Sequence, residues 1–306
     1  MSFLGQQNII WFNGEFICDE KANISIASHT IHYGSGAFEG VRVYETERGP
    51  AIFRAEEHTQ RLFNSARLIG MKLPFDQKTI LRAQQEVIRR NHFSSAYLRP
   101  VVFYNDNSLG VYPQGNDVHV SVIAWDWKNY FGAEKDQGIS VVTSTFKRLY
   151  PGSVFAKAKI TGHYVNSILA LQEAKRKGYQ EAILFDCNGF IAEGSSANIF
   201  LVKNNILYTP TDANILPGIT RDTIMALARD ANYQVVEKNL TRDELYLADE
   251  IFFSGTASEV TPVSFVDDLP VGDGTTGPVT TEMRDAYFEV THGKSHKYEH
   301  WNTIVE

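Results

Sequence analysis

The second half of the chain consists largely of short apolar segments separated by turn signals. Residues 181–186 and 190–193 flank Asn188-Gly189, and Asn204-Asn205 joins two further segments of this kind. Asn and Gly adopt the positive φ angles that tight hairpins require. Few amphipathic helices interrupt these segments. We therefore expect a domain built on a β-barrel or a strongly curved sheet in this half.

The first part of the chain mixes similar strands with two amphipathic helices. Asn13-Gly14 is a hairpin signal between two short apolar segments. Apolar residues recur at helical spacing over residues 55–70 and again over 77–91. Local antiparallel pairing with two helices over the sheet is typical of a small α+β domain.

The chain has 306 residues, which is more than one core usually serves, so we expect two domains. The charged and Gly-containing stretch 128–138 is the expected boundary. The resulting fold class is α+β, with a small α+β domain over residues 1–133 and a larger domain with a barrel-like β core over 134–306.

Several local patterns give further expectations. Residues 24–28 suggest a strand, and residues 29–42 a flexible glycine-containing loop. Pro100 suggests that its strand is an edge or carries a bulge. In a helix that begins at Tyr164, the apolar pattern places Ile168 and Leu169 mostly inward and Glu173 mostly outward.

Composition excludes several classes of function. The net charge is −7 and no long basic cluster occurs, so a nucleic-acid partner is not expected. No apolar run reaches the length of a membrane span, and the N-terminus lacks the pattern of a signal peptide. Cys18 and Cys187 lie far apart and read as reduced thiols. We expect a cytoplasmic protein.

Lys159 lies in a run of small and apolar residues just before the helix that begins at Tyr164. A lysine at such a junction is either a solvated surface charge or a partly desolvated amine. A desolvated amine has a lowered pKa and can attack a carbonyl to form a Schiff base. Lys157 lies two residues earlier and competes for this role, because residues two apart on a strand face the same side.

Three other features suit a phosphorylated carbonyl cofactor. Gly218 and Thr220 stand at a helix start, where free N–H groups and the helix dipole attract anions, although a simple helix cap has the same appearance. Residues 254–257 form a small-residue turn. Glu193, beside a glycine, is either a surface turn residue or a carboxylate that faces a pyridinium. Together with Lys159, these features are what pyridoxal phosphate requires.

Other mechanisms lack their motifs. No Gly-x-Gly-x-x-Gly stands between a strand and a helix, and no Gly-x-Ser-x-Gly elbow occurs. His292, His296 and His300 are spaced at four, but Gly293 and the charged context favour a solvated tail over a metal site. We expect no metal.

An ordered set of motifs resembles the class IV (fold type IV) pyridoxal-phosphate-dependent aminotransferases, and within them the bacterial branched-chain amino acid aminotransferases. The resemblance covers nearly the whole chain, from about residue 10 to 290. The motifs are His32-Tyr-Gly34, Ala37-Phe-Glu-Gly40, His58-x-x-Arg-Leu62, Ala96-Tyr-Leu-Arg-Pro100, Lys159-x-x-Gly-x-Tyr164, Glu193-Gly194, Leu216-Pro-Gly-Ile-Thr-Arg221 and Ser254-Gly-Thr-Ala-x-Glu259.

The resemblance implies a role for each site residue. Lys159, five residues before Tyr164 as the family motif requires, would form the Schiff base and act as the catalytic base. The expected cofactor-binding residues are Arg61, Lys159, Tyr164, Glu193, Gly218, Ile219, Thr220 and Thr256. The expected substrate-binding residues are Tyr33, Phe38, Tyr97, Arg99, Leu109, Val111, Trp127, Tyr130, Thr256 and Ala257. Arg99 would receive the distal carboxylate of glutamate, and Leu109 and Val111 would reach into a neighbouring subunit, which implies a homodimer.

The implied reaction is amino transfer between leucine, isoleucine or valine and 2-oxoglutarate. Residues 195–198 depart from many branched-chain members and are closer to D-amino-acid aminotransferases and aminodeoxychorismate lyases. A D-amino-acid or (R)-amine aminotransferase is therefore the alternative, and the lyase is less favoured. A non-catalytic cofactor-binding protein is the alternative from another class.

Overall fold

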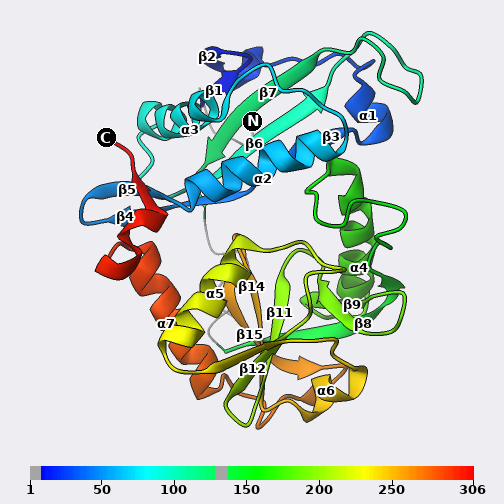
Figure 1. Ribbon diagram of the computed structural model, residues 1–306, viewed down its shortest axis with the longest axis vertical. Coiled ribbons are helices and arrows are strands. Elements are labelled where there is room, and N and C mark those ends of the chain that lie inside the picture. The colour runs from blue at the N-terminus through cyan, green and yellow to red at the C-terminus, as the bar shows by residue number, and fades with distance from the viewer. Residues whose placement is uncertain (1–7, 128–136) are drawn as a thin grey trace. The chain divides into compact units, whose positions relative to one another are not determined.

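A computed structural model describes residues 8–127 and 137–306 of the chain (Figure 1). The described residues form two compact units. Unit 1 comprises residues 8–127, Ala158–His163 and Val290–Glu306, and unit 2 comprises 137–157 and Tyr164–Glu289. The domain boundary expected at 133/134 lies outside the described residues. The segment that contains Lys159 thus belongs to unit 1, although its chain neighbours on both sides belong to unit 2.

Unit 1 is an eight-stranded sheet with helices on one face. The strand order is β17-β5-β4-β6-β7-β1-β2, and β3 pairs with β6. The strands are β1 (Ile9–Phe12), β2 (Glu15–Cys18), β3 (Gly36–Phe38), β4 (Val41–Thr46), β5 (Gly49–Phe53), β6 (Ala96–Tyr104), β7 (Val118–Trp125) and β17 (Asn302–Ile304). The helices are α1 (His29–Tyr33), α2 (Ala55–Leu68), α3 (Gln77–Arg90) and the 3₁₀ helices η1 (Asp19–Lys21) and η4 (His296–Trp301).

The two faces of this sheet differ in chemistry. Leu98 and Val102 of β6 are buried in the core that α2 and α3 cover. Because successive side chains of a strand alternate between faces, Tyr97 and Arg99 lie on the opposite face. Arg42 of β4 shares that face by the same alternation, since Val41 and Val43 belong to the core. Unit 1 therefore has an apolar face under its helices and a face of aromatic and cationic side chains.

Pro100 is not at a sheet edge, so that expectation was wrong. It lies within β6, which pairs with β7 from Tyr97 to Tyr104 and places Pro100 opposite Val122. On its other side, β6 pairs with β4 up to Leu98 and with β3 from Val101. Pro100 thus falls in the gap between two partner strands, where a missing N–H breaks no ladder bond.

Two other local expectations for unit 1 were also wrong. Residues 24–28 form turns and coil rather than a strand. The loop expected over 29–42 contains helix α1 and strand β3. Gly34 ends α1 in the left-handed conformation, with φ of 63°, and its N–H donates to Thr30 O. The glycines therefore shape a short helix and a strand.

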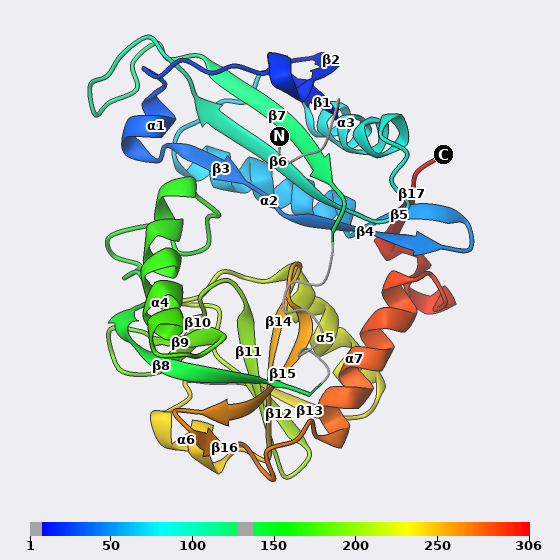
Figure 2. The same ribbon diagram turned by 180° about the vertical axis from the view of Figure 1, so that it is seen from behind.

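Unit 2 contains a nine-stranded mixed sheet of order β10-β9-β8-β15-β14-β11-β12-β13, with β16 paired to β15. Strand β8 lies across the direction of β11 and β14, as in a strongly curled sheet (Figure 2). The strands are β8 (Ile139–Lys147), β9 (Glu181–Phe185), β10 (Ile191–Gly194), β11 (Asn198–Lys203), β12 (Ile206–Thr209), β13 (Gln234–Glu237), β14 (Glu250–Gly255), β15 (Glu259–Val266) and β16 (Leu269–Pro270). The helices are α4 (Tyr164–Arg176), α5 (Ile219–Asp230), α6 (Arg242–Leu247) and α7 (Pro278–Thr291), which continues into unit 1, and the 3₁₀ helix η3 (Thr161–His163) of unit 1 precedes α4.

Helix α4 presents a different face to the core from the one expected. Glu173 is only 7% exposed, whereas Ile168 is 52% exposed. Ala170 and Ala174 pack against β8 and β9, and the Glu173 carboxylate accepts hydrogen bonds from Ser144 Oγ at 2.7 Å and Thr145 N at 3.0 Å. A buried carboxylate with partners on β8 therefore overrides the apolar pattern. Within the described ranges, no helix is long and apolar enough to cross a membrane.

Candidate active site

The backbone of Lys159 is held from two sides within unit 1. Its N–H donates to Ser65 Oγ of α2 at 2.9 Å, and its carbonyl accepts from Phe38 N at 3.1 Å. The next residue, Ile160, forms an isolated bridge with Ala37. Lys159 Nζ lies 5.0 Å from the centroid of the Phe38 ring. The amine is thus presented beside an aromatic face from a fixed backbone.

Lys157, the competitor, has a different setting. Its Nζ pairs with Asp212 of unit 2 at 2.7 Å, and the two side chains are 52% and 54% exposed. The Lys157 amine is thus engaged in a solvent-exposed ion pair at the surface of unit 2. The geometry therefore favours Lys159 as the reactive lysine.

Arg61, the predicted phosphate ligand, belongs to a buried polar cluster with Glu39 and His58. Its Nε donates to Glu39 Oε1 at 2.6 Å and its Nη2 to Glu39 Oε2 at 2.8 Å. His58 Nδ1 lies 2.7 Å from Glu39 Oε2. Burial alone would raise the pKa of Glu39, but Arg61 and His58 outweigh it and hold that pKa well below its usual range. Burial lowers the pKa of His58, and the charges of Arg61 and Lys159 lower it further, against the opposing effect of Glu39.

Arg99 is surrounded by aromatic rings on the face of the unit 1 sheet that lies opposite α2 and α3. Its Cζ lies 4.7 Å from the ring centroid of Phe38 and 5.6 Å from that of Tyr97. Its Nε is buried and has no hydrogen-bond partner among the described residues. A buried guanidinium nitrogen without a partner is suited to an anion, because leaving it unpaired is costly. This fits the predicted role of Arg99 toward a carboxylate.

The aromatic wall continues from Tyr97. The Tyr97 ring lies 4.5 Å from that of Trp127, and Arg42 stacks over Trp127 at 5.8 Å. A Cβ on Gly40 would lie 1.9 Å from the Tyr97 hydroxyl oxygen, so only glycine fits there. The structure thus groups Phe38, Tyr97, Arg99 and Trp127 in unit 1, while Tyr130 lies outside the described residues.

Tyr33, Leu109 and Val111 form a separate group. The Tyr33 hydroxyl donates to Leu109 O at 2.8 Å, and His29 Nε2 lies 3.0 Å from Gly110 O. Leu109 is 49% and Val111 80% exposed. Helix α1 therefore holds the loop that presents these apolar side chains to solvent.

In unit 2, Glu193 is a buried residue at the end of β10. Its Oε1 accepts from Arg148 Nε, and its Oε2 accepts from Asn198 Nδ2 at 3.1 Å and from Leu216 N at 3.3 Å. These three donors hold the carboxylate in one orientation. A carboxylate held in one orientation suits the predicted pairing with a ring nitrogen.

Helix α5 offers an anion cradle in the same unit. Gly218 is its N-cap and provides no side-chain cap, and the first helical bond runs from Asp222 N to Gly218 O. Within the described ranges, the N–H groups of Ile219 and Thr220 have no protein acceptor. A Cβ on Gly218 would lie 1.9 Å from Asn198 Oδ1. Such a helix start is suited to a phosphate.

The turn between β14 and β15 carries two further unpaired groups. Ser254 Oγ and Ser258 Oγ are buried and have no hydrogen-bond partner in the described part of the chain. They flank Thr256 and Ala257, the residues predicted to bind phosphate and carboxylate. Tyr164 is the first residue of α4. Taken by itself, each unit thus contains residues that fit the chemistry of a phosphorylated, carbonyl-bearing cofactor.

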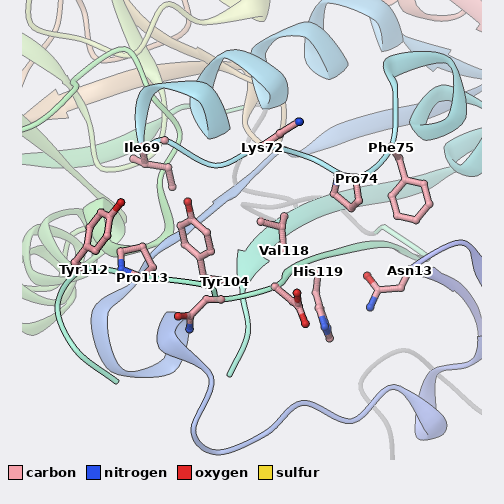
Figure 3. Close-up of a pocket in the computed structure, with 13 residues that line it drawn as sticks. Asn13, Ile69, Lys72, Pro74, Phe75, Tyr104, Tyr112, Pro113, Val118 and His119 are labelled. Carbon is pink, nitrogen blue, oxygen red and sulfur yellow. The ribbon is translucent and has the colours of Figure 1, made fainter. Parts of the chain in front are cut away.

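A surface groove of about 790 Å³ in unit 1 contains none of the predicted site residues (Figure 3). The loop between α2 and α3 supplies Lys72, Pro74 and Phe75, and the loop before β7 supplies Tyr112 and Pro113. The groove therefore does not bear on the site predictions. Among the described residues, no cluster of three His, Cys, Asp or Glu side chains is arranged to hold a metal.

Comparison with known proteins assigns the family. The family model described as amino-transferase class IV matches residues 36–266. The chain belongs to the class IV aminotransferases. The predicted family is thereby confirmed.

Individual relatives carry a narrower name. The branched-chain-amino-acid aminotransferase of Pseudomonas aeruginosa is 45% identical and covers 100% of both chains. A crystal structure of the Escherichia coli branched-chain amino acid aminotransferase matches with a TM-score of 0.96 at 42% identity, over 98% of this chain and 100% of that one. The Thermobaculum terrenum enzyme of the same name, in its PLP form, matches with a TM-score of 0.92 at 30% identity, over 98% of this chain and 99% of that one.

The sequence predictions omitted several residues that now accompany the site. They are Glu39, His58, Arg148, Ser254 and Ser258. Glu39 and His58 lie inside the family motifs, but their partnership spans 19 residues and has no local pattern. A carboxylate directly after a predicted pocket residue, Phe38, was the one available signal.

Proposed function

We propose that this protein is a branched-chain-amino-acid aminotransferase that depends on pyridoxal 5'-phosphate. It moves an amino group reversibly between L-leucine, L-isoleucine or L-valine and 2-oxoglutarate, in two half-reactions that share one site. The observation that carries the proposal is Lys159, whose backbone is fixed by Phe38 and Ser65 and whose amine lies beside an aromatic ring. The names of the full-length relatives support the substrate class.

Each part of the cofactor has a proposed holder. Lys159 binds its aldehyde carbon, Tyr164 its phenolic oxygen and Glu193 its ring nitrogen. The proposed phosphate ligands are Arg61, the N–H groups of Ile219 and Thr220 beside Gly218, and Thr256. When bound, the cofactor supplies an aldehyde that captures amines and a protonated ring that withdraws electrons from the substrate. Lys159 Nζ would move the proton of the substrate Cα, and the Glu193 carboxylate, oriented by its three donors, would face the ring nitrogen.

The proposed substrate pocket serves two kinds of side chain. Aliphatic groups pack against Tyr33, Phe38, Trp127 and Tyr130, where burial contributes about 25 cal/mol per Å². The distal carboxylate of glutamate or 2-oxoglutarate pairs with Arg99, whose Nε has no hydrogen-bond partner among the described residues. Tyr97 and the backbone of Thr256 and Ala257 hold the α-carboxylate.

We also propose a cytoplasmic homodimer in which Leu109 and Val111 enter the neighbouring subunit's pocket. The exposure of the adjacent Val111 and Tyr112, 80% and 78%, supports this, because neighbouring apolar side chains exposed together mark an interaction surface. On α4, Val165 and Ile168 are likewise exposed.

The free Cys18 and Cys187 suit a reducing compartment. The proposed domains of this enzyme are a small domain over residues 1–133 and a larger cofactor-binding domain over residues 134–306.

The alternative of a D-amino-acid or (R)-amine aminotransferase rests on residues 195–198. Ser195 Oγ donates to the buried Glu181 at 2.9 Å, and Ser195 N donates to the same carboxylate at 3.2 Å. Ser195 is thus engaged in supporting the loop. The unusual sequence of this loop therefore has a structural explanation that does not require a different substrate.

A half-reaction separates these functions. Cofactor-loaded protein is mixed separately with L-leucine, D-alanine and an (R)-amine, and its visible absorbance is followed. We expect L-leucine alone to bleach the visible band and 2-oxoglutarate to restore it. Bleaching by D-alanine or the amine would favour the alternative, and no spectral response to any amine would indicate a non-catalytic cofactor-binding protein.

A further inference from the structure

Glu39 is a fully buried carboxylate for which the proposed function has no role. Its exposed fraction is 0%. It directly follows β3, and its N–H donates to Pro100 O at 2.9 Å, in the gap where β6 changes partners. A buried carboxylate is costly unless it is fully paired. The hydrogen-bond partners of Glu39 therefore indicate its role.

On one side, Glu39 fixes the guanidinium of Arg61. The pair is bidentate, with distances of 2.6 and 2.8 Å, and this geometry sets the plane of the guanidinium. His58 lies one helical turn before Arg61 on α2 and approaches Glu39 Oε2 at 2.7 Å. Because an ionised carboxylate only accepts hydrogen bonds, His58 Nδ1 is the donor. Glu39, itself bonded to His58, thus holds Arg61 in one orientation.

On the other side, the same two elements hold Lys159. Phe38, the residue before Glu39, donates its N–H to Lys159 O at 3.1 Å. Ser65 of α2, one turn beyond Arg61, accepts from Lys159 N at 2.9 Å. Positions 58, 61 and 65 lie on one stripe of the helix. Strand β3 and helix α2 therefore meet twice, at the Glu39–Arg61 pair and at the Lys159 backbone.

We propose that Glu39 is a positioning residue that ties Arg61 to the segment carrying Lys159, so that the phosphate anchor and the aldehyde anchor of the cofactor are spaced before the cofactor binds. This inference rests on the roles proposed for Arg61 and Lys159. It predicts that Glu39 contributes to affinity for the phosphate of the cofactor, although it does not touch the phosphate. Preorganising a ligand's contacts in this way reduces the ordering that binding requires.

A Glu39→Gln substitution tests the proposal with little change in shape. The amide nitrogen of the new glutamine donates and cannot accept a hydrogen bond, but it faces donors on Arg61 or His58. The bidentate pair is therefore lost and Arg61 is released. The apoprotein is titrated with pyridoxal 5'-phosphate and with pyridoxal, which lacks the phosphate, and dissociation constants are measured by fluorescence quenching. Removing partners that orient a ligand group lowers affinity by about 10–100-fold in metal sites. We expect a loss of that size for pyridoxal 5'-phosphate and a change of less than about twofold for pyridoxal.

Reference variants make each outcome decisive. Arg61→Ala should show the same phosphate-specific loss, and Glu56→Gln, an exposed carboxylate on the same helix, should show none. If Glu39→Gln does not fold, Glu39→Asp keeps the charge but shortens the reach, and should also weaken the phosphorylated cofactor selectively. Equal losses for both cofactors would mean a merely structural role and overturn the proposal. If Arg61→Ala loses affinity for pyridoxal 5'-phosphate and the Glu39 variants do not, this inference alone is overturned. If Arg61→Ala keeps its affinity for pyridoxal 5'-phosphate, the role proposed for Arg61 is overturned, and the inference with it.

Discussion

At the scale of single residues, the charged side chains Glu39 and Arg99 differ in how their polar atoms are paired. Glu39 has two charged or polar partners within unit 1, at 2.6 to 2.8 Å. Arg99 has aromatic neighbours, and its buried Nε has no hydrogen-bond partner among the described residues. A charge satisfied internally supports the site, whereas one without an anion is suited to a ligand.

Arg99 should therefore discriminate between the two kinds of substrate. Truncating one partner of a buried charge pair costs about 2–5 kcal/mol, so Arg99→Ala should lower kcat/KM for glutamate by about 30-fold or more. The effect on leucine should stay below about tenfold, because an aliphatic side chain makes no ion pair. Steady-state kinetics with both amino acids checks this, with the exposed Arg48→Ala as control. Equal losses for both substrates would contradict the role given to Arg99.

At the scale of elements, several strands, turns and helices could be predicted from local signals, whereas contacts between residues distant in sequence could not. The Asn13-Gly14 hairpin and the starts of α2 and α3 follow from adjacent residues, and the structure has all three. The buried face of α4 was mispredicted because Glu173 is bonded by Ser144, which is distant in sequence. The place of Pro100 was mispredicted because β6 changes its partner from β4 to β3 there, and both strands are distant in sequence from Pro100. Periodicity describes a helix but does not identify its partner.

The acid dependence of stability should report on Glu173 of α4. Burial alone would raise the pKa of Glu173, but hydrogen bonds from Lys177, Ser144 and Thr145 lower it to about 2. Since the unfolded value is about 4.3, this carboxylate stabilises the native state above that pH, and its contribution is lost as the pH falls toward about 2. Glu173→Gln should lower the free energy of unfolding at pH 7 by about 1–3 kcal/mol and flatten its decline in acid.

Urea unfolding at a series of pH values measures this effect. The exposed Glu56→Gln variant should follow the wild type throughout. A Glu173→Gln variant whose stability declines in acid as steeply as that of the wild type would contradict the assignment.

At the scale of the whole molecule, the family and the α+β fold class were predicted from ordered motifs and are confirmed. The site residues stay predictions, and the structure groups them within each unit. Lys159, Arg61, Phe38 and Arg99 belong to unit 1, and Glu193 and the start of α5 belong to unit 2. Motifs identified these residues one by one, but the supporting pairs, such as Arg148 with Glu193, became visible only in three dimensions.

The proposed assembly gives a test at the same scale. Val111→Asp places a charge on a side chain that the proposed dimer buries in the neighbouring subunit. We expect it to shift sedimentation toward the monomer and to raise KM for leucine. Leu269→Asp, a comparably exposed apolar position at 54%, should do neither. A dimeric Val111→Asp protein with an unchanged KM would refute the shared pocket.

The most direct test of the proposed chemistry is to locate the lysine that carries the cofactor. Cofactor-loaded protein is reduced with sodium borohydride, digested and mapped by mass spectrometry. We predict a single phosphopyridoxyl label on Lys159, and none in a Lys159→Ala variant. A label on Lys157, or no label on any lysine, would contradict the role assigned to Lys159.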